Sequence, residues 1–226
     1  MLPPGVLPKM PKRHGSSQNI CVHNYNALQR DLLDRYLEEL YLWNARVNLT
    51  SVPQAEAWSK HIDESVALLE AVNFAQGASV ADLGTGAGLP GIPIAVVRPD
   101  LAMTLVESDM RKAGFLDHVL GLLGLPCVVA NMRVEELGRG LLRESFDVVL
   151  TRAAFPPGLV PEMALPLAKV GGMVVAVERD AEAAASEMLA SCQECGGDVE
   201  RAESGVVVIR KVSATPERYP RRRPKQ

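Results

Sequence analysis

Three glycines and two acids occupy positions in this sequence where a ligand could bind. Residues 79–90 read SVADLGTGAGLP, so an apolar run containing Asp82 leads into glycines at 84, 86 and 88. Glycine permits positive φ and removes side chains where a ligand approaches the backbone. Pro90 suits the first turn of a helix, whose initial N–H groups are free to face a ligand. This order predicts a strand, a ligand-binding turn and a helix.

Two classes of ligand use such a turn, and the acids discriminate between them. Dinucleotide-binding enzymes need Gly-x-Gly-x-x-Gly, whereas the spacing here is Gly-x-Gly-x-Gly. Asp82, two residues before the first glycine, would repel a pyrophosphate but would suit the cationic S-adenosylmethionine. Glu107 ends the next apolar run, where a ribose-binding carboxylate belongs in a doubly wound sheet. The alternative is a plain glycine-rich turn with solvated acids.

These residues need a parallel sheet to position them, and the hydrophobic pattern supplies one. Near-continuous apolar runs, typical of buried parallel strands, alternate with segments of helical spacing. A hairpin turn is expected at 203–205, and two helices precede the first strand, one capped by Asn26 with Gln29 and one by Ser51 with Gln54. We expect strands at 79–83, 101–107, 126–130, 146–151, 172–178 and 205–211, and helices at 89–97, 110–123, 157–168 and 180–195. The pattern predicts an α/β, Rossmann-like fold with a seven-stranded, mostly parallel sheet of the class I S-adenosylmethionine-dependent methyltransferase type and an N-terminal helical extension.

Polar residues follow two further strands, where ligands of open parallel sheets bind. Val134 and Glu135 would flank an adenine, although Glu135 could instead be an acid favoured at a helix N-terminus. Arg152 follows the fourth strand, where its guanidinium could pair with a carboxylate or a phosphate, or form a salt bridge to Asp82 or Glu107. The run Phe155-Pro156-Pro157-Gly158 lacks the polar residue that amino-group methyltransferases place before Pro-Pro, and we interpret it as a loop and helix start.

Charge is distributed unevenly along the 226 residues. Residues 1–20 and 210–226 carry ten of the 24 basic side chains, whereas 26 of the 27 acids lie in the segment 21–209 between them. Basic ends on an acidic body suggest contact with an anion such as RNA, with solubilising ends as the alternative. We expect four segments: a disordered tail at 1–23, a helical extension at 24–76, a methyltransferase domain at 77–211 and a basic tail at 212–226.

Other compositional features argue against several classes of protein. No apolar run approaches the length of about 20 residues that crosses a membrane, and 1–10 lacks the apolar region of a signal peptide, so we expect a cytoplasmic protein. The four cysteines are too few for a disulfide scaffold, and Cys192 with Cys195 forms a lone CxxC without further ligands. We therefore expect no metal, and nothing in the sequence demands more than a monomer.

The chain resembles the bacterial small-subunit ribosomal RNA guanine-N7 methyltransferase G family, also called the glucose-inhibited division protein B family. The matching stretches span about 25–220, and the run from Asp82 to Pro93 together with the Asn48-Leu49-Thr50 segment is the most specific. The others are Trp43-Asn44, His61 to Ser65, Arg133 to Glu136, Thr151 to Ala153, and Thr215-Pro216 through Tyr219-Pro220. Two departures concern Glu64, where the family usually has Asp, and Glu178-Arg179, where it often has Lys-Gly.

The resemblance implies methyl transfer from S-adenosylmethionine to N7 of a guanine in small-subunit (16S) rRNA, free or within the 30S particle. Arg152 would position the reactants, and no general base is needed because N7 has a free lone pair. Cofactor contacts are expected at Asp82, Gly84, Gly86, Gly88, Leu89, Glu107, Val134, Glu135 and Arg152, and RNA contacts at Asn48, Thr50, Arg218, Arg221, Arg222 and Arg223. The alternatives are a methyltransferase for another RNA, a protein or a small molecule, a non-catalytic RNA chaperone, and, more remotely, an NAD-dependent oxidoreductase.

Overall fold

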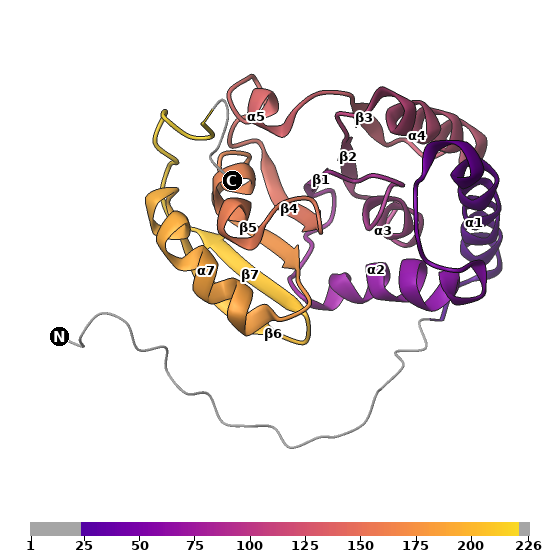
Figure 1. Cartoon of the computed structure of the whole chain (residues 1–226), viewed down its shortest axis with the longest axis horizontal. Coiled ribbons are helices and arrows are strands. Elements are labelled where there is room, and N and C mark those ends of the chain that lie inside the picture. The colour runs from indigo at the N-terminus through magenta and orange to yellow at the C-terminus, as the bar shows by residue number, and fades with distance from the viewer. Residues whose placement is uncertain (1–23, 222–226) are drawn as a thin grey trace, which may run out of the picture.

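A single seven-stranded sheet organises the computed structural model, which describes residues 24–221 (Figure 1). The strand order is β3-β2-β1-β4-β5-β7-β6; the pairs among the first five are parallel, and β7 pairs antiparallel with both β5 and β6. The strands are β1 (Ser79–Leu83), β2 (Ala102–Val106), β3 (Val128–Ala130), β4 (Phe146–Arg152), β5 (Ala168–Val177), β6 (Gly197–Glu203) and β7 (Val206–Lys211). This confirms the predicted fold class and the predicted hairpin turn at 203–205. The predicted tail at 1–23 lies outside the described residues.

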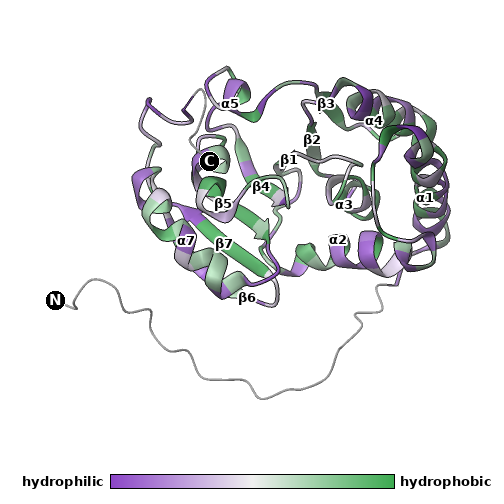
Figure 2. Cartoon of the chain, viewed as in Figure 1, coloured by the Kyte–Doolittle hydropathy of each residue, from purple (hydrophilic) through white to green (hydrophobic). Residues whose placement is uncertain are grey.

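Helices cover both faces of the sheet and give three layers. One hydrophobic cluster contains residues of α1 (Ala27–Val47), α3 (Gly91–Val97) and α4 (Met110–Leu123), and the other contains residues of α5 (Val134–Leu137), α6 (Val160–Ala164) and α7 (Ala181–Glu194). Strand β1 is buried on both sides, with Val80 in the first cluster and Ala81 and Leu83 in the second. This double burial explains why the sequence of β1 is a largely apolar run, and the neighbouring strand β4 is likewise mostly buried. Strand β7, which appears green in Figure 2, shows the same apolar character, whereas the outermost strand β6 is largely polar.

Helix α1 begins where the sequence predicts. The Asn26 side chain accepts a hydrogen bond from the Gln29 backbone N–H at 2.9 Å, and the Gln29 side chain accepts one from the Asn26 N–H at 3.0 Å. The capping box is therefore confirmed. The next helical run is less regular than predicted and consists of η1 (Gln54–Glu56), η2 (Trp58–Asp63), α2 (Glu64–Val66) and η3 (Ala67–Glu70). The predicted Ser51 cap is wrong, because Pro53 occupies the N-cap position and no side chain caps this run.

Other predicted boundaries also differ from the structure, among them the strand predicted at 172–178, which begins at Ala168. Helix α3 begins at Gly91, which makes Pro90 the N-cap residue instead of part of the first turn. The predicted helix 157–168 is shorter, comprising η4 (Pro157–Leu159) and α6, which ends at Ala164. Pro166 follows, and Ala168 already pairs with Phe146 in the sheet. The run 155–158 is a loop leading into η4, as predicted.

The described part of the C-terminal segment packs against the body of the protein. Arg143 donates hydrogen bonds to the carbonyl oxygens of Thr215, at 2.6 Å, and Tyr219, at 2.8 Å. Lys211, whose side chain is fully buried, donates to Glu144 at 2.9 Å and to the Thr215 hydroxyl at 2.8 Å. These contacts hold residues 212–221 as a strap beside α5 and α6.

A buried tyrosine connects α1 to the glycine-rich turn. The Tyr36 hydroxyl donates to the Ala87 carbonyl at 2.9 Å, and the Tyr36 side chain is inaccessible to solvent.

We predict that Tyr36→Phe lowers the free energy of unfolding by about 1–2 kcal/mol, because the Ala87 carbonyl loses its buried partner. Urea denaturation measures this change. In the control Tyr41→Phe, the lost partner is the half-buried Val52 carbonyl, which water can reach. A loss for Tyr36→Phe no larger than for the control would contradict the prediction.

Candidate cofactor site

The glycine-rich turn folds back over the carboxyl end of β1. Gly84 has φ of +64°, and a Cβ atom there would lie 2.5 Å from Cβ of Ala154 in the loop after β4. Gly86 has φ of +58°, but a Cβ there would meet nothing closer than 3.9 Å. Gly84 is therefore required by close packing, whereas Gly86 opens onto free space where a ligand can reach the backbone.

Glu107 fixes this turn from the end of β2. One carboxylate oxygen accepts the Gly86 N–H at 3.0 Å, and the other accepts the Asp109 N–H at 2.7 Å. Its backbone carbonyl accepts the Asn131 side-chain amide at 2.8 Å, which links it to the segment after β3. Glu107 is thus held in place by the segments that follow three adjacent strands, and the remaining lone pairs of its carboxylate can accept hydroxyl groups of a ribose.

A pocket of about 750 Å³ opens beside these residues, a size suited to a nucleoside-containing ligand. Val134 and Glu135 form part of its wall from the start of α5, and Arg133 holds Glu135 through a hydrogen bond of 3.0 Å. Other lining residues come from the loops after β1, β2, β3 and β4 and from α6; they are Gly84, Gly86, Glu107, Ser108, Lys112, Met132, Ala153, Ala154, Phe155, Pro156, Leu159 and Met163. The structure therefore brings together Gly84, Gly86, Glu107, Val134 and Glu135 of the predicted cofactor residues.

Asp82, Gly88 and Leu89 lie outside the wall of this pocket. Asp82 is fully buried beneath the turn, where it accepts the Thr85 hydroxyl at 2.5 Å and the Gly91 N–H at 2.9 Å. Its other oxygen has no hydrogen-bond partner. Burial raises the pKa of Asp82 to about 6, although the Thr85 and Gly91 hydrogen bonds oppose this shift. In this arrangement Asp82 braces the turn from inside.

Arg152 lies at the end of β4 but lines a second pocket of about 870 Å³. Its guanidinium donates to the Lys60 carbonyl at 3.1 Å and lies 3.8 Å from a Glu64 carboxylate oxygen. The alternative partners expected from the sequence, Asp82 and Glu107, form no salt bridge with it. Ala153, the next residue, lines both pockets, so Arg152 is separated from the cofactor pocket by one residue of backbone.

The predicted RNA contacts are partly engaged within the protein. The Thr50 hydroxyl lies 2.9 Å from His61 Nε2 and accepts the Val52 N–H at 3.1 Å, while Asn48 is the left-handed C-cap of α1. The Arg221 guanidinium donates hydrogen bonds to the buried Glu162 carboxylate and lies 5.8 Å from the centre of the Tyr219 ring. The Arg218 guanidinium lies 5.0 Å from the centre of the same ring. Arg222 and Arg223 lie outside the described residues.

Several lining residues were not predicted from the sequence. Ser108 and Met132 lie within two residues of strand ends, so the strand-end rule could have found them. Lys112 lies in the first turn of α4, which the rule does not cover. Ala153 and Ala154 carry no functional group and give no signal of this kind. Among residues 24–221, no group of three or more His, Cys, Asp or Glu side chains could hold a metal ion, and no helix is long and apolar enough to cross a membrane.

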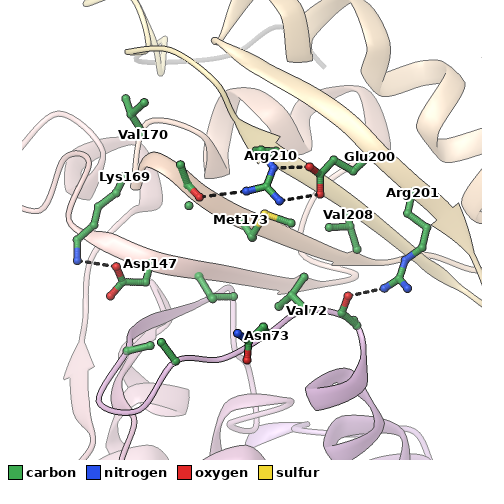
Figure 3. Close-up of a pocket in the computed structure, with 16 residues that line it drawn as sticks. Val72, Asn73, Asp147, Lys169, Val170, Met173, Glu200, Arg201, Val208 and Arg210 are labelled. Atoms are coloured by element: carbon green, nitrogen blue, oxygen red, sulfur yellow. Dashed lines mark hydrogen bonds and ion pairs between the residues drawn. The ribbon is translucent and has the colours of Figure 1, made fainter.

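A third pocket, of about 890 Å³, lies at the opposite end of the strands, where β4 and β5 begin (Figure 3). Its charged side chains are paired with one another or with the backbone. Lys169 donates to Asp147 at 2.8 Å, Arg210 pairs with Glu200, and Arg201 points toward the Ala71 carbonyl, to which it donates a hydrogen bond. Because its charges are paired internally and it lies at the strand ends far from the glycine-rich turn, this pocket is a weaker candidate for the cofactor site.

Comparisons with known proteins agree on a family. The family model for rRNA small subunit methyltransferase G matches residues 29–212. A ribosomal RNA small subunit methyltransferase G from Halalkalibacterium halodurans is 36% identical over 211 residues, covering 86% of this chain and 87% of the relative. One from Chloroflexus aggregans is also 36% identical, over 212 residues, with 88% and 87% covered. The solved structure of TrmN from Thermus thermophilus is similar in fold, with a TM-score of 0.53 and 20% identity, covering 73% of this chain and 55% of that one.

The raised pKa of Asp82 predicts a pH dependence of stability. The folded-state pKa of about 6 exceeds the unfolded value of about 3.9, so the folded protein binds this proton more tightly and loses stability as pH rises through 6. We predict that the stability of Asp82→Asn minus that of the wild type rises by about 2 kcal/mol between pH 4 and pH 7.

Urea denaturation across this range measures the difference. Asp147→Asn is the control, because hydrogen bonds from Lys169 and Ser79 lower the pKa of Asp147 to about 2, and its titration lies below the range. Parallel pH profiles for Asp82→Asn and the wild type would show that Asp82 does not titrate with a raised pKa.

Proposed function

This chain belongs to the rRNA small subunit methyltransferase G family, and we propose that it transfers the methyl group of S-adenosylmethionine to N7 of one guanine in small-subunit rRNA. The observation that carries the proposal for the cofactor is the 750 Å³ pocket at the glycine-rich turn, with Glu107 at its edge. Glu107 would accept the ribose hydroxyls, and Val134 with Met132 would provide an apolar wall for the adenine. The pocket thus has the donor and acceptor chemistry that this ligand needs.

The proposed reaction requires little proton transfer by the protein. S-adenosylmethionine, when bound, supplies a methyl group on a sulfonium, and guanine N7 attacks with a lone pair that carries no proton. The contribution of the chain is then to hold the two reactants in line, which can lower a barrier by about 7–11 kcal/mol. Arg152, fixed by the Lys60 carbonyl and by Glu64 beside the cofactor pocket, is our candidate for positioning the acceptor.

We further propose that the acceptor is ribosomal RNA, that the protein acts in the cytoplasm and that it is a monomer. The major groove of A-form RNA is too deep and narrow for side chains to reach N7. A guanine in a loop, or one that ribosomal proteins have not yet covered, would therefore be the substrate. Arg218 lies in the strap, whose last residue, Arg221, pairs with Glu162 of α6, and Met163 of the same helix lines the cofactor pocket. Arg222 and Arg223 come next in the sequence.

The central test maps modified nucleotides by mass spectrometry. We predict that small-subunit rRNA from cells lacking this gene has no methyl group at one specific guanine, and that the purified full-length protein with S-adenosylmethionine restores N7-methylguanine there. Free rRNA and 30S particles are tested separately. Heat-inactivated protein is the control, and an unchanged rRNA map in both arms would defeat the proposal.

A second prediction concerns the basic C-terminal end. Deleting residues 222–226 removes Arg222, Arg223 and Lys225 and leaves the Arg221–Glu162 contact in place. If these side chains neutralise RNA phosphates, binding weakens and the slope of log K against log salt falls by about 0.7 per lost contact. Filter binding from 50 to 300 mM KCl measures the slope. A variant with three Gln residues at these positions separates charge from length, and an unchanged slope in both would remove this end from the RNA interface.

A further inference from the structure

The 870 Å³ pocket that Arg152 lines adjoins the cofactor pocket. It lies at the carboxyl ends of β4 and β5 and at the turn between β6 and β7, and it shares Ala153 with the cofactor pocket. The turn of the β6–β7 hairpin lies near the end of the helical run 54–70 (Figure 1). Residues of both segments line the pocket, and Arg201 of β6 donates a hydrogen bond to the Ala71 carbonyl. A base held here would therefore be next to a methyl donor bound at the glycine-rich turn.

The backbone between the two pockets is unusual. Ala153 has φ of +52°, a left-handed conformation that is unfavourable for a residue with a Cβ atom. Ala154, which follows it, packs against Gly84, while Arg152, which precedes it, points to the other pocket. This strained residue thus directs adjacent side chains to the two pockets, and strained backbone of this kind is concentrated at functional sites.

Two carboxylates that line the second pocket, those of Glu64 and Glu178, differ in whether they already have partners. Glu64 is engaged with Lys60 at 3.0 Å and lies 3.8 Å from Arg152. Glu178 is half-buried at the end of β5, and its side chain makes no hydrogen bond or ion pair with any described residue. Its backbone N–H donates to the Gly205 carbonyl at 2.9 Å, which fixes its main chain at the pocket wall. Burial, with a contribution from Glu187, raises the pKa of Glu178.

Guanine chemistry matches a free carboxylate at this position. The Watson–Crick edge of guanine carries two adjacent donors, N1–H and the N2 amino group, which a carboxylate can accept together. N7 lies on the opposite side of the base, so binding by the Watson–Crick edge leaves N7 free to face the methyl group. Adenine presents an acceptor at N1 and would not make this pair.

We infer that Glu178 determines specificity for guanine by accepting hydrogen bonds from N1–H and N2–H of the target base in the second pocket. This rests on the proposed function, since it assigns the acceptor for that same reaction. It concerns this chain in particular, because the family that the sequence resembles often has Lys-Gly where Glu178-Arg179 stands.

The test pairs Glu178→Gln with a change in the base. Small-subunit rRNA is assembled by ligation with either guanosine or inosine at the mapped position. Inosine differs from guanosine only in lacking the 2-amino group. The rRNA is used free or reconstituted into particles, whichever form the wild type methylates. We expect inosine to lower wild-type kcat/KM by about 10- to 100-fold, the range for a good bidentate contact to a base. We expect Glu178→Gln to lose a similar factor on guanosine and to show no further loss on inosine. Glu182→Gln, at an exposed position on α7, is the matched control and should behave as the wild type.

Three measurements separate the outcomes. If the wild type makes no N7-methylguanine, the proposed function fails. If the wild type is active and Glu178→Gln is equally active, or suffers the same inosine penalty, the assignment of Glu178 alone fails. Melting temperature and calorimetric affinity for S-adenosylmethionine should be unchanged in Glu178→Gln, and a fall in cofactor affinity by the same factor as in activity would likewise overturn the assignment.

Discussion

Two carboxylates hold the glycine-rich turn from opposite sides, and the cofactor pocket depends on both. Asp82 accepts hydrogen bonds from Thr85 and Gly91 beneath the turn, and Glu107 accepts the Gly86 N–H from the side of the pocket. A turn made of glycines has little conformational preference of its own. Its shape must therefore come from groups outside it, and acids at the ends of adjacent strands are in reach because β1 and β2 are paired in register from Ser79 and Ala102 to Leu83 and Val106.

The two acids differ in chemistry because they differ in surroundings. Burial raises the pKa of Asp82, so part of its hydrogen-bond energy is offset by desolvation of its charge. One carboxylate oxygen of Asp82 has no hydrogen-bond partner among residues 24–221, which costs folding free energy. Such a cost is tolerated where the surrounding packing is strong, and here Tyr36 of α1 binds the Ala87 carbonyl of the same turn. The N-terminal helical extension thereby contributes to the rigidity of a site to which it adds no side chain.

The cofactor half of the site could be predicted from the sequence more completely than the acceptor half. Strands appear as apolar runs because both faces of the sheet are covered, and the strand-end rule then locates Glu107 and Val134. The same rule finds Asp82 and Arg152 but not the direction of their side chains. Asp82 turns inward to Gly91, and Arg152 reaches Lys60, a residue 92 positions away, because of how the helical run 54–70 packs. Packing of this kind leaves no local pattern in the sequence.

A further difference between the halves lies in what each uses for recognition. The cofactor pocket relies on backbone groups and glycines, which any member of the family can keep with few constraints elsewhere. The second pocket is lined by charged side chains from the helical run 54–70, β4 and the end of β5. Glu64 and Glu178-Arg179, the two departures expected from the family resemblance, lie in its wall. Side-chain recognition can change one residue at a time, since a new carboxylate needs only a hydrogen-bond donor on the ligand and access to it. If the second pocket binds the acceptor, as we propose, it is where this chain can differ from its relatives while the glycine-rich turn stays the same.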